Sequence, residues 1–100
     1  MLDANQVRLE HRYAGASAPE QMVWDLLTVE QAAGDAHRVA ELLKALYSGP
    51  WLNAGWSKGG QAAVFHRYFH PDDVVGTVAY DAPLPRSLED ERLDHFFSVV

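Results

Sequence analysis

The sequence contains no cysteine, and this absence excludes disulfide bonds, zinc sites built on thiolates and cysteine nucleophiles. Long apolar runs are missing too, since none approaches the roughly 20 residues that a membrane-spanning helix needs. Basic residues are few: 8 Lys and Arg stand against 14 Asp and Glu, for a formal net charge of −6. Nucleic acids and anionic membranes would repel such a surface, so we expect neither as a partner.

The remaining composition is that of a small globular domain, with 48% hydrophobic and 22% charged residues in a chain of 100. A chain of this length can bury one modest core. Residues 1–10 do not show the basic and then apolar pattern of a secretory signal peptide, so we expect any export signal to lie upstream.

The N-terminal half of the chain predicts one strand and one helix. Residues 6–13 alternate apolar and charged side chains with the period of a strand, and a loop of small residues follows. Residues 28–48 place their apolar side chains on one stripe of a helix. Thr28 and Gln31 form a capping box at its start, and Gly49-Pro50 is a stop signal at its end.

The C-terminal half predicts four more elements: a strand over 51–55, a helix over 59–70, a strand over 74–80 and a helix over 88–98. Pro71 ends the first of these helices, and Ser87 is the expected cap of the second. The run 74–80 is almost continuously apolar, which is typical of a strand buried on both faces. Trp24, Trp51 and Phe69 are expected in the core.

The alternation of strands and helices predicts an α/β fold with parallel strands joined by helical crossovers. Three strands are few for such a sheet, and the chain ends on the apolar segment HFFSVV. We therefore expect an incomplete domain, the N-terminal part of a larger core. Sheet edges that lack a neighbour could also allow the chain to associate with itself.

A serine lies between two glycines in Gly55-Trp56-Ser57-Lys58-Gly59, which fits the pattern G-x-S-x-G over residues 55–59. A predicted strand precedes this turn and a predicted helix follows it, as in a nucleophile elbow. The glycines give room where strand and helix nearly touch. The backbone N–H of Lys58, at the positive end of the helix, would face a developing oxyanion. The alternative is an ordinary glycine-rich turn that opens a helix.

The residues around this turn resemble a known family. The stretch GWSKGGQAAVFHRYFHPDDVVGTVAYDAP resembles the region of the active serine in the secreted tripeptidyl aminopeptidases of actinobacteria. The upstream stretches NQVRLEHRYAGAS and DLLTVEQAAGDAHRVAELLKALYSGPWL resemble that family's preceding strand, loop and helix. The resemblance covers almost the whole chain and keeps the same order. It departs at Trp56, Gln61 and Asp81, where the family usually has other residues.

The resemblance implies part of an α/β-hydrolase core that belongs to a secreted serine peptidase acting on peptides. It implies Ser57 as the nucleophile and the N–H of Lys58 as one oxyanion donor. A second N–H should come from the loop after the first strand, and Tyr13 or Ala14 is the candidate. We expect no cofactor and no metal site. The pair His66-x-x-x-His70 has metal-ligand spacing, but Arg67 stands where the zincin pattern requires glutamate.

The acid and the base of a catalytic triad are not evident in this sequence. In α/β-hydrolases they follow the serine in the order Asp or Glu, then His. His66 and His70 lie on the helix that starts at the serine, and His95 follows the last strand too closely. We therefore expect both partners beyond Val100 and a chain that is inactive alone. Alternatives are another α/β-hydrolase (a prolyl carboxypeptidase-like enzyme or an esterase) and a shortened product without catalytic activity.

Overall fold

The structure is a computed structural model that describes residues 3–87 and 89–100. Its helices and strands follow one another as α1 (Val29–Lys44), β1 (Leu52–Trp56), α2 (Lys58–Phe69), β2 (Gly76–Tyr80) and α3 (Glu91–Val99). Two short 3-10 turns, Gly15–Ser17 and Trp24–Leu26, precede α1. Among the described residues, no helix is both long and apolar enough to cross a membrane.

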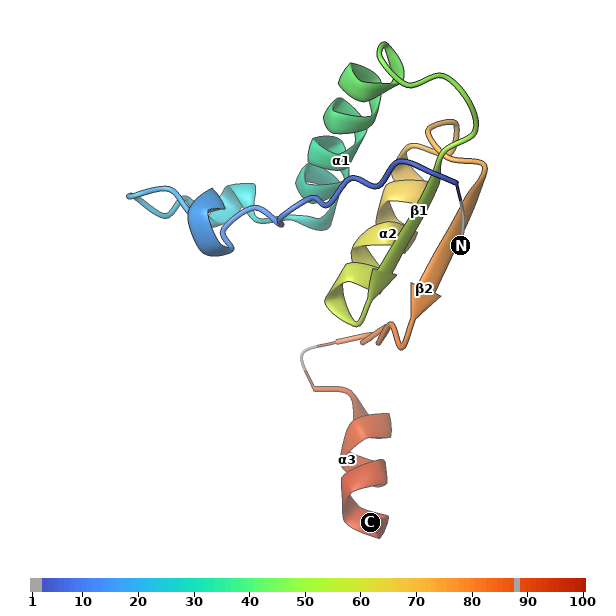
Figure 1. The fold of residues 1–100 in the computed structure, drawn as a ribbon. Coiled ribbons are helices and arrows are strands. Elements are labelled where there is room, and N and C mark those ends of the chain that lie inside the picture. The colour runs from blue at the N-terminus through green and yellow to red at the C-terminus, as the bar shows by residue number, and fades with distance from the viewer. Residues whose placement is uncertain (1–2, 88) are drawn as a thin grey trace.

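The two strands are parallel, and α2 makes the crossover between them (Figure 1). Leu52 pairs with Gly76 at one end of the sheet, and Trp56 pairs with Tyr80 at the other. Two parallel strands need such a crossover, because the chain must return to the end of the sheet at which the first strand began. The prediction of parallel strands with a helical crossover is therefore confirmed.

Helix α2 lies in the middle of the molecule, with the sheet on one side and α1 on the other (Figure 1). Small side chains are buried on both helices, Ala33 and Ala40 on α1 and Ala63 on α2. Small residues let two helices approach closely and so bury the apolar parts of both. Val74, in the turn that leads into β2, completes the apolar core.

The ends of the helices are set by local hydrogen bonds. Thr28 Oγ1 accepts the N–H of Gln31 at 3.1 Å, the capping contact predicted at the start of the first helix. This helix ends at Lys44 rather than at 48. Before α3, the capping side chain is Asp90, which accepts the N–H of Arg92 at 3.1 Å, and not Ser87 as predicted. The predicted start of α3, Leu88, lies outside the described residues.

The prediction of a strand over 6–13 needs correction, because residues 3–11 have no regular secondary structure. A strand requires a neighbour to satisfy its backbone N–H and C=O groups, and within the described residues the sheet consists of β1 and β2. The segment is held instead by Arg12, whose guanidinium forms two hydrogen bonds of 2.7 Å with the carboxylate of Asp35 on α1.

The burial of the apolar side chains also differs from expectation. The run 74–80 was expected to be buried on both faces, yet Val78 is 40% exposed and Tyr80 54% exposed. Trp24, expected in the core, is 65% exposed. In both cases the apolar sequence shows that the side chains could be buried. Burial also requires another helix, strand or loop that packs over them. Within the described residues, the sheet face opposite α2 has no such cover, and Leu52 and Trp56 are exposed there as well.

Candidate active site

Ser57 lies between the last residue of β1 and the first residue of α2. Its backbone has φ 53° and ψ −120°, a conformation that residues other than glycine rarely adopt. Such a conformation costs on the order of 1–3 kcal/mol and persists only where the surroundings enforce it. The surroundings of Ser57 must therefore hold it in this conformation.

Two glycines enforce the turn, because backbone segments meet there with no room for a side chain. A Cβ atom at Gly55 would lie 2.1 Å from the carbonyl oxygen of Gly59. A Cβ atom at Gly60 would lie 2.8 Å from Ala82 Cβ and 3.1 Å from the oxygen of Gly55. Gly59 has open space around its Cβ position. The sequence pattern named Gly55 and Gly59, whereas the close approach involves the side-chain positions of Gly55 and Gly60.

Hydrogen bonds tie the turn to the end of β2. The N–H of Ser57 donates to the carbonyl of Tyr80 at 2.9 Å, and the carbonyl of Ser57 accepts the N–H of Gln61 at 3.1 Å. The side-chain amide of Gln61 donates to the carbonyl of Pro83. Asp81, between these anchors, also has a positive φ of 49°. The backbone of Ser57 is thus fixed on both sides.

The side chain of Ser57 is exposed and caps no backbone group of α2. Lys58 is the first residue of α2, so no earlier helical turn offers a carbonyl to its N–H. The positive end of the helix dipole lies at the same place and favours negative charge. The turn therefore presents a hydroxyl next to a backbone donor and a favourable electrostatic field, the arrangement that an oxyanion requires.

The loop around Tyr13, predicted to supply a second oxyanion donor, has a different arrangement. Tyr13 has a positive φ of 65°, its N–H donates to Ser17 O at 3.0 Å, and its hydroxyl donates to Val23 O at 2.5 Å. The N–H of Ala14 donates to His11 O at 3.1 Å. Both candidate amides are thus used inside their own loop. A catalytic role for either would require this loop to rearrange.

A cavity of about 200 Å³ lies beside the first turns of α1 and α2. Its wall is mostly apolar, with Leu27, Ala33 and Phe65 among the lining residues, and Lys58 brings it next to the serine turn. A larger hollow of about 510 Å³ is lined by residues between Arg12 and Leu26 and includes none of the turn. The smaller cavity is therefore the one adjacent to the candidate nucleophile.

The PS-10 peptidase S37 family model matches the chain over residues 1–100. The chain belongs to this family. It is 44% identical over 101 residues to the prolyl tri/tetrapeptidyl aminopeptidase of Streptomyces mobaraensis. The match covers the whole chain but only 21% of the relative, so the chain spans about a fifth of that protein's length. No solved structure matches.

No histidine that could act as a base lies next to Ser57 among the described residues. His37, His66 and His70 gather near Asp73, at the opposite end of α2. His11 lines the smaller cavity, and His95 lies on the exposed helix α3. In the described part of the chain, Ser57 Oγ has no histidine as a hydrogen-bond partner.

The sequence suggested part of the cluster around Asp73, since Asp72 or Asp73 could add a carboxylate to the pair His66 and His70, but the contact with His37 was not predicted. Asp73 Oδ2 lies 2.8 Å from both His37 Nδ1 and His66 Nε2. His37 and Asp73 are 36 residues apart in the sequence, so no local spacing could reveal their contact. The available signals were the i, i+4 spacing of His66 and His70, which places both toward the same end of α2, and the carboxylates that follow that helix at Asp72 and Asp73.

Proposed function

We propose that this chain carries the nucleophilic serine of an S37 peptidyl aminopeptidase, which hydrolyses peptide bonds near the free N-termini of peptides. One observation carries the proposal: Ser57 adopts a strained backbone conformation in a glycine-enforced strand–turn–helix. Strain of this kind is retained where a function needs it, and a nucleophile elbow is the known use of this geometry. Membership of a peptidase family supports the same assignment.

In the proposed reaction, Ser57 Oγ attacks the carbonyl carbon of the scissile peptide bond. The carbonyl oxygen becomes an oxyanion and accepts a hydrogen bond from the N–H of Lys58. Because that N–H is free and pre-positioned, it stabilises the charge without reorganisation. The base that takes the proton of Ser57 returns it to the leaving nitrogen, so that the intermediate collapses and releases the C-terminal part of the peptide. Water then loses a proton to the same base and attacks the acyl-enzyme, and the base gives that proton to Ser57 Oγ as the serine leaves.

A serine hydroxyl is a weak nucleophile until a base removes its proton. Since no described histidine contacts Ser57, we propose that an acid and a base from residues other than those described complete the site. The described chain alone should then hydrolyse peptides at a negligible rate. The relative's name indicates tripeptides and tetrapeptides as products of that enzyme, and short N-terminal peptides are the substrate class that we propose for this one.

A chimera tests the proposal. Residues 1–100 replace the aligned segment of the Streptomyces mobaraensis aminopeptidase, to which they are 44% identical. We expect a folded chimera to release short peptides from a chromogenic substrate, and we expect Ser57→Ala to reduce kcat by about 10⁴-fold or more. Ser48→Ala, a change outside the turn, is the matched control and should leave kcat unchanged. A folded, active chimera that tolerates Ser57→Ala would refute the assignment.

A further inference from the structure

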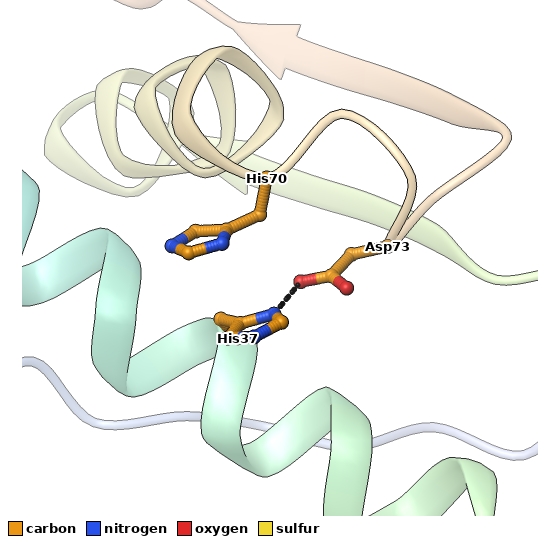
Figure 2. A group of neighbouring side chains, drawn as sticks. All are labelled: His37, His70 and Asp73. Atoms are coloured by element: carbon orange, nitrogen blue, oxygen red, sulfur yellow. Dashed lines mark hydrogen bonds and ion pairs between the residues drawn. The ribbon is translucent and has the colours of Figure 1, made fainter.

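Three side chains from three segments meet at the C-terminal end of α2. His37 comes from α1, His70 follows the last residue of α2, and Asp73 lies in the turn before β2 (Figure 2). One possible ligand atom from each residue lies within 4.8 Å of the other two. Asp73 is only 7% exposed, whereas both imidazoles are half-buried and open to solvent. This cluster lies at the other end of α2 from Ser57.

We propose that His37, His70 and Asp73 bind a divalent transition-metal ion, with Zn²⁺ as the best match. Two imidazole nitrogens and one carboxylate oxygen form a donor set that suits Zn²⁺, and solvent would supply the fourth ligand. A formal net charge of −6 raises the local concentration of cations at the surface. The proposal is independent of the serine chemistry.

The contact of His37 with Glu41 resembles those that orient metal ligands. The second nitrogen of His37, Nε2, lies 3.5 Å from Glu41 Oε2. A ligating histidine commonly donates its outer N–H to a carboxylate, which fixes the ring and strengthens the inner nitrogen as a ligand. Glu41 is placed to accept a hydrogen bond from the N–H of His37 Nε2 when His37 Nδ1 binds the ion.

The carboxylate of Asp73 is oriented by a hydrogen bond from His66. Asn53 Nδ2 lies 3.0 Å from the carbonyl oxygen of Ala63 and 3.1 Å from His66 Nδ1. A carbonyl oxygen only accepts, so the amide nitrogen donates to both and His66 Nδ1 carries no proton. His66 Nε2 then bears the proton and donates to Asp73 Oδ2 at 2.8 Å. His66 is thus a support for the carboxylate and not a ligand.

Binding requires one imidazole to turn. The rings of His37 and His70 are stacked, with centroids 4.0 Å apart and planes within 5° of parallel (Figure 2). Nitrogens of parallel rings do not point at one common atom, and ligand atoms around Zn²⁺ lie about 3.3 Å apart for Zn–N bonds of about 2.0–2.1 Å. His70 lies just past the helix and is half-buried. Its ring can therefore rotate toward the ion without displacing the core.

Lys44 competes with the ion for the same carboxylate. Its ammonium lies 3.5 Å from Asp73 Oδ1, and its side chain is 34% exposed. A bound cation would repel this charge and move it into solvent. Removing the charge should therefore tighten metal binding at this carboxylate.

The test is calorimetric titration of the full chain with Zn²⁺ at neutral pH, together with Co²⁺ absorption spectra that report tetrahedral coordination. We expect one saturable site in the wild-type chain and at least a tenfold loss of affinity in His70→Gln. Lys44→Met should bind more tightly than the wild type. His95→Gln, on α3, is the matched control and should bind like the wild type.

Several results would overturn the proposal. One is the absence of saturable binding in the wild-type chain. Others are equal affinity in His70→Gln or a loss of affinity in His95→Gln. If circular dichroism shows that His70→Gln is unfolded, an NMR titration of the wild-type chain with Zn²⁺ tests the proposal instead. Imidazole NMR signals of His37 and His70 must then shift on adding Zn²⁺ while those of His95 do not.

Discussion

The two ends of α2 are built by different means. At its N-terminal end, backbone close approach at Gly55 and Gly60 forces Ser57 into a rare conformation and leaves its hydroxyl exposed. At its C-terminal end, side chains from separate segments converge on the buried carboxylate of Asp73. One end constrains a backbone and exposes a hydroxyl group, whereas the other satisfies buried polar groups. A substitution should therefore act through sterics at the first end and through lost hydrogen bonds at the second.

The largest effect is expected at the N-terminal end. Gly55→Val would place a Cβ atom 2.1 Å from the present position of the Gly59 carbonyl oxygen. The strand and the helix would therefore have to separate. We expect a loss of more than about 3 kcal/mol in the free energy of unfolding. Urea denaturation followed by circular dichroism measures it.

Gly59→Ala is the control for this prediction, because no atom lies within 4 Å of its Cβ position. It should change the free energy of unfolding by less than about 1 kcal/mol, with a helix-favouring residue in place of glycine. Equal losses for Gly55→Val and Gly59→Ala would contradict the described packing of the turn.

At the C-terminal end, Asp73→Asn should be the most damaging single change. It removes the negative charge that accepts hydrogen bonds from His37 and His66 and pairs with Lys44. We expect a loss of about 2–3 kcal/mol, since hydrogen bonds to a charged group are among the stronger ones. The neighbouring change Asp72→Asn, at an exposed side chain, should stay within about 0.5 kcal/mol. Similar denaturation midpoints for both variants would show that the cluster contributes little to stability.

Acid should weaken the C-terminal end of α2. Burial raises the pKa of Asp73, but hydrogen bonds from His66 and His37 and the charge of Lys44 outweigh it and hold that pKa below the ordinary 3.8. A carboxyl with a depressed folded-state pKa stabilises the fold above its unfolded pKa and loses this contribution as pH falls through the folded value. Stability should therefore fall below about pH 3.8, where Asp73 protonates in the unfolded chain first.

Arg12 lowers the pKa of Asp35 through its hydrogen bonds, so Asp35 adds to the same acid-dependent loss. Urea unfolding at a series of pH values measures the effect. Asp73→Asn should flatten the dependence, and Asp35→Asn should flatten it further. If the free energy of unfolding of Asp73→Asn falls with acid as steeply as that of the wild type, Asp73 is not the cause of the acid dependence.

The smallest expected effect has the opposite sign. Ser57→Gly should relieve the strain at φ 53° and ψ −120°, because glycine adopts this conformation freely. After the entropy that glycine costs in the unfolded chain, a net gain of about 1 kcal/mol is expected. Ser48→Gly, at a residue with negative φ, should be slightly destabilising instead. Thermal unfolding of both variants checks the sign, and destabilisation by Ser57→Gly would mean that the turn is not strained.

The two ends also differ in what their sequence revealed. The serine turn occupies consecutive residues, so the pattern over 55–59 and the flanking periodicities predicted a strand, a turn and a helix there. The pattern over 55–59 could not show that a Cβ atom would be crowded at Gly60 and unhindered at Gly59, because the crowding at Gly60 comes from Ala82 across the turn. Local sequence determines the type of turn, and tertiary contact determines which glycine is indispensable.

The remaining features depended on contacts between distant segments. The alternation in 6–13 is consistent with a strand, but strand formation requires a paired neighbour, and Arg12 instead binds Asp35 on α1. The cluster at Asp73 needs residues 36 positions apart to meet. Neither arrangement follows from the spacing of residue types within a short window.

The most direct test of the central claim is covalent labelling of Ser57 by a fluorophosphonate in the chimera with the Streptomyces mobaraensis aminopeptidase. Peptide mass spectrometry identifies the labelled residue. We expect one phosphonylated peptide, containing Ser57, that is absent after Ser57→Ala, and no comparable labelling of the chain on its own. Labelling of another serine in an active chimera, with Ser57 unmodified, would contradict it.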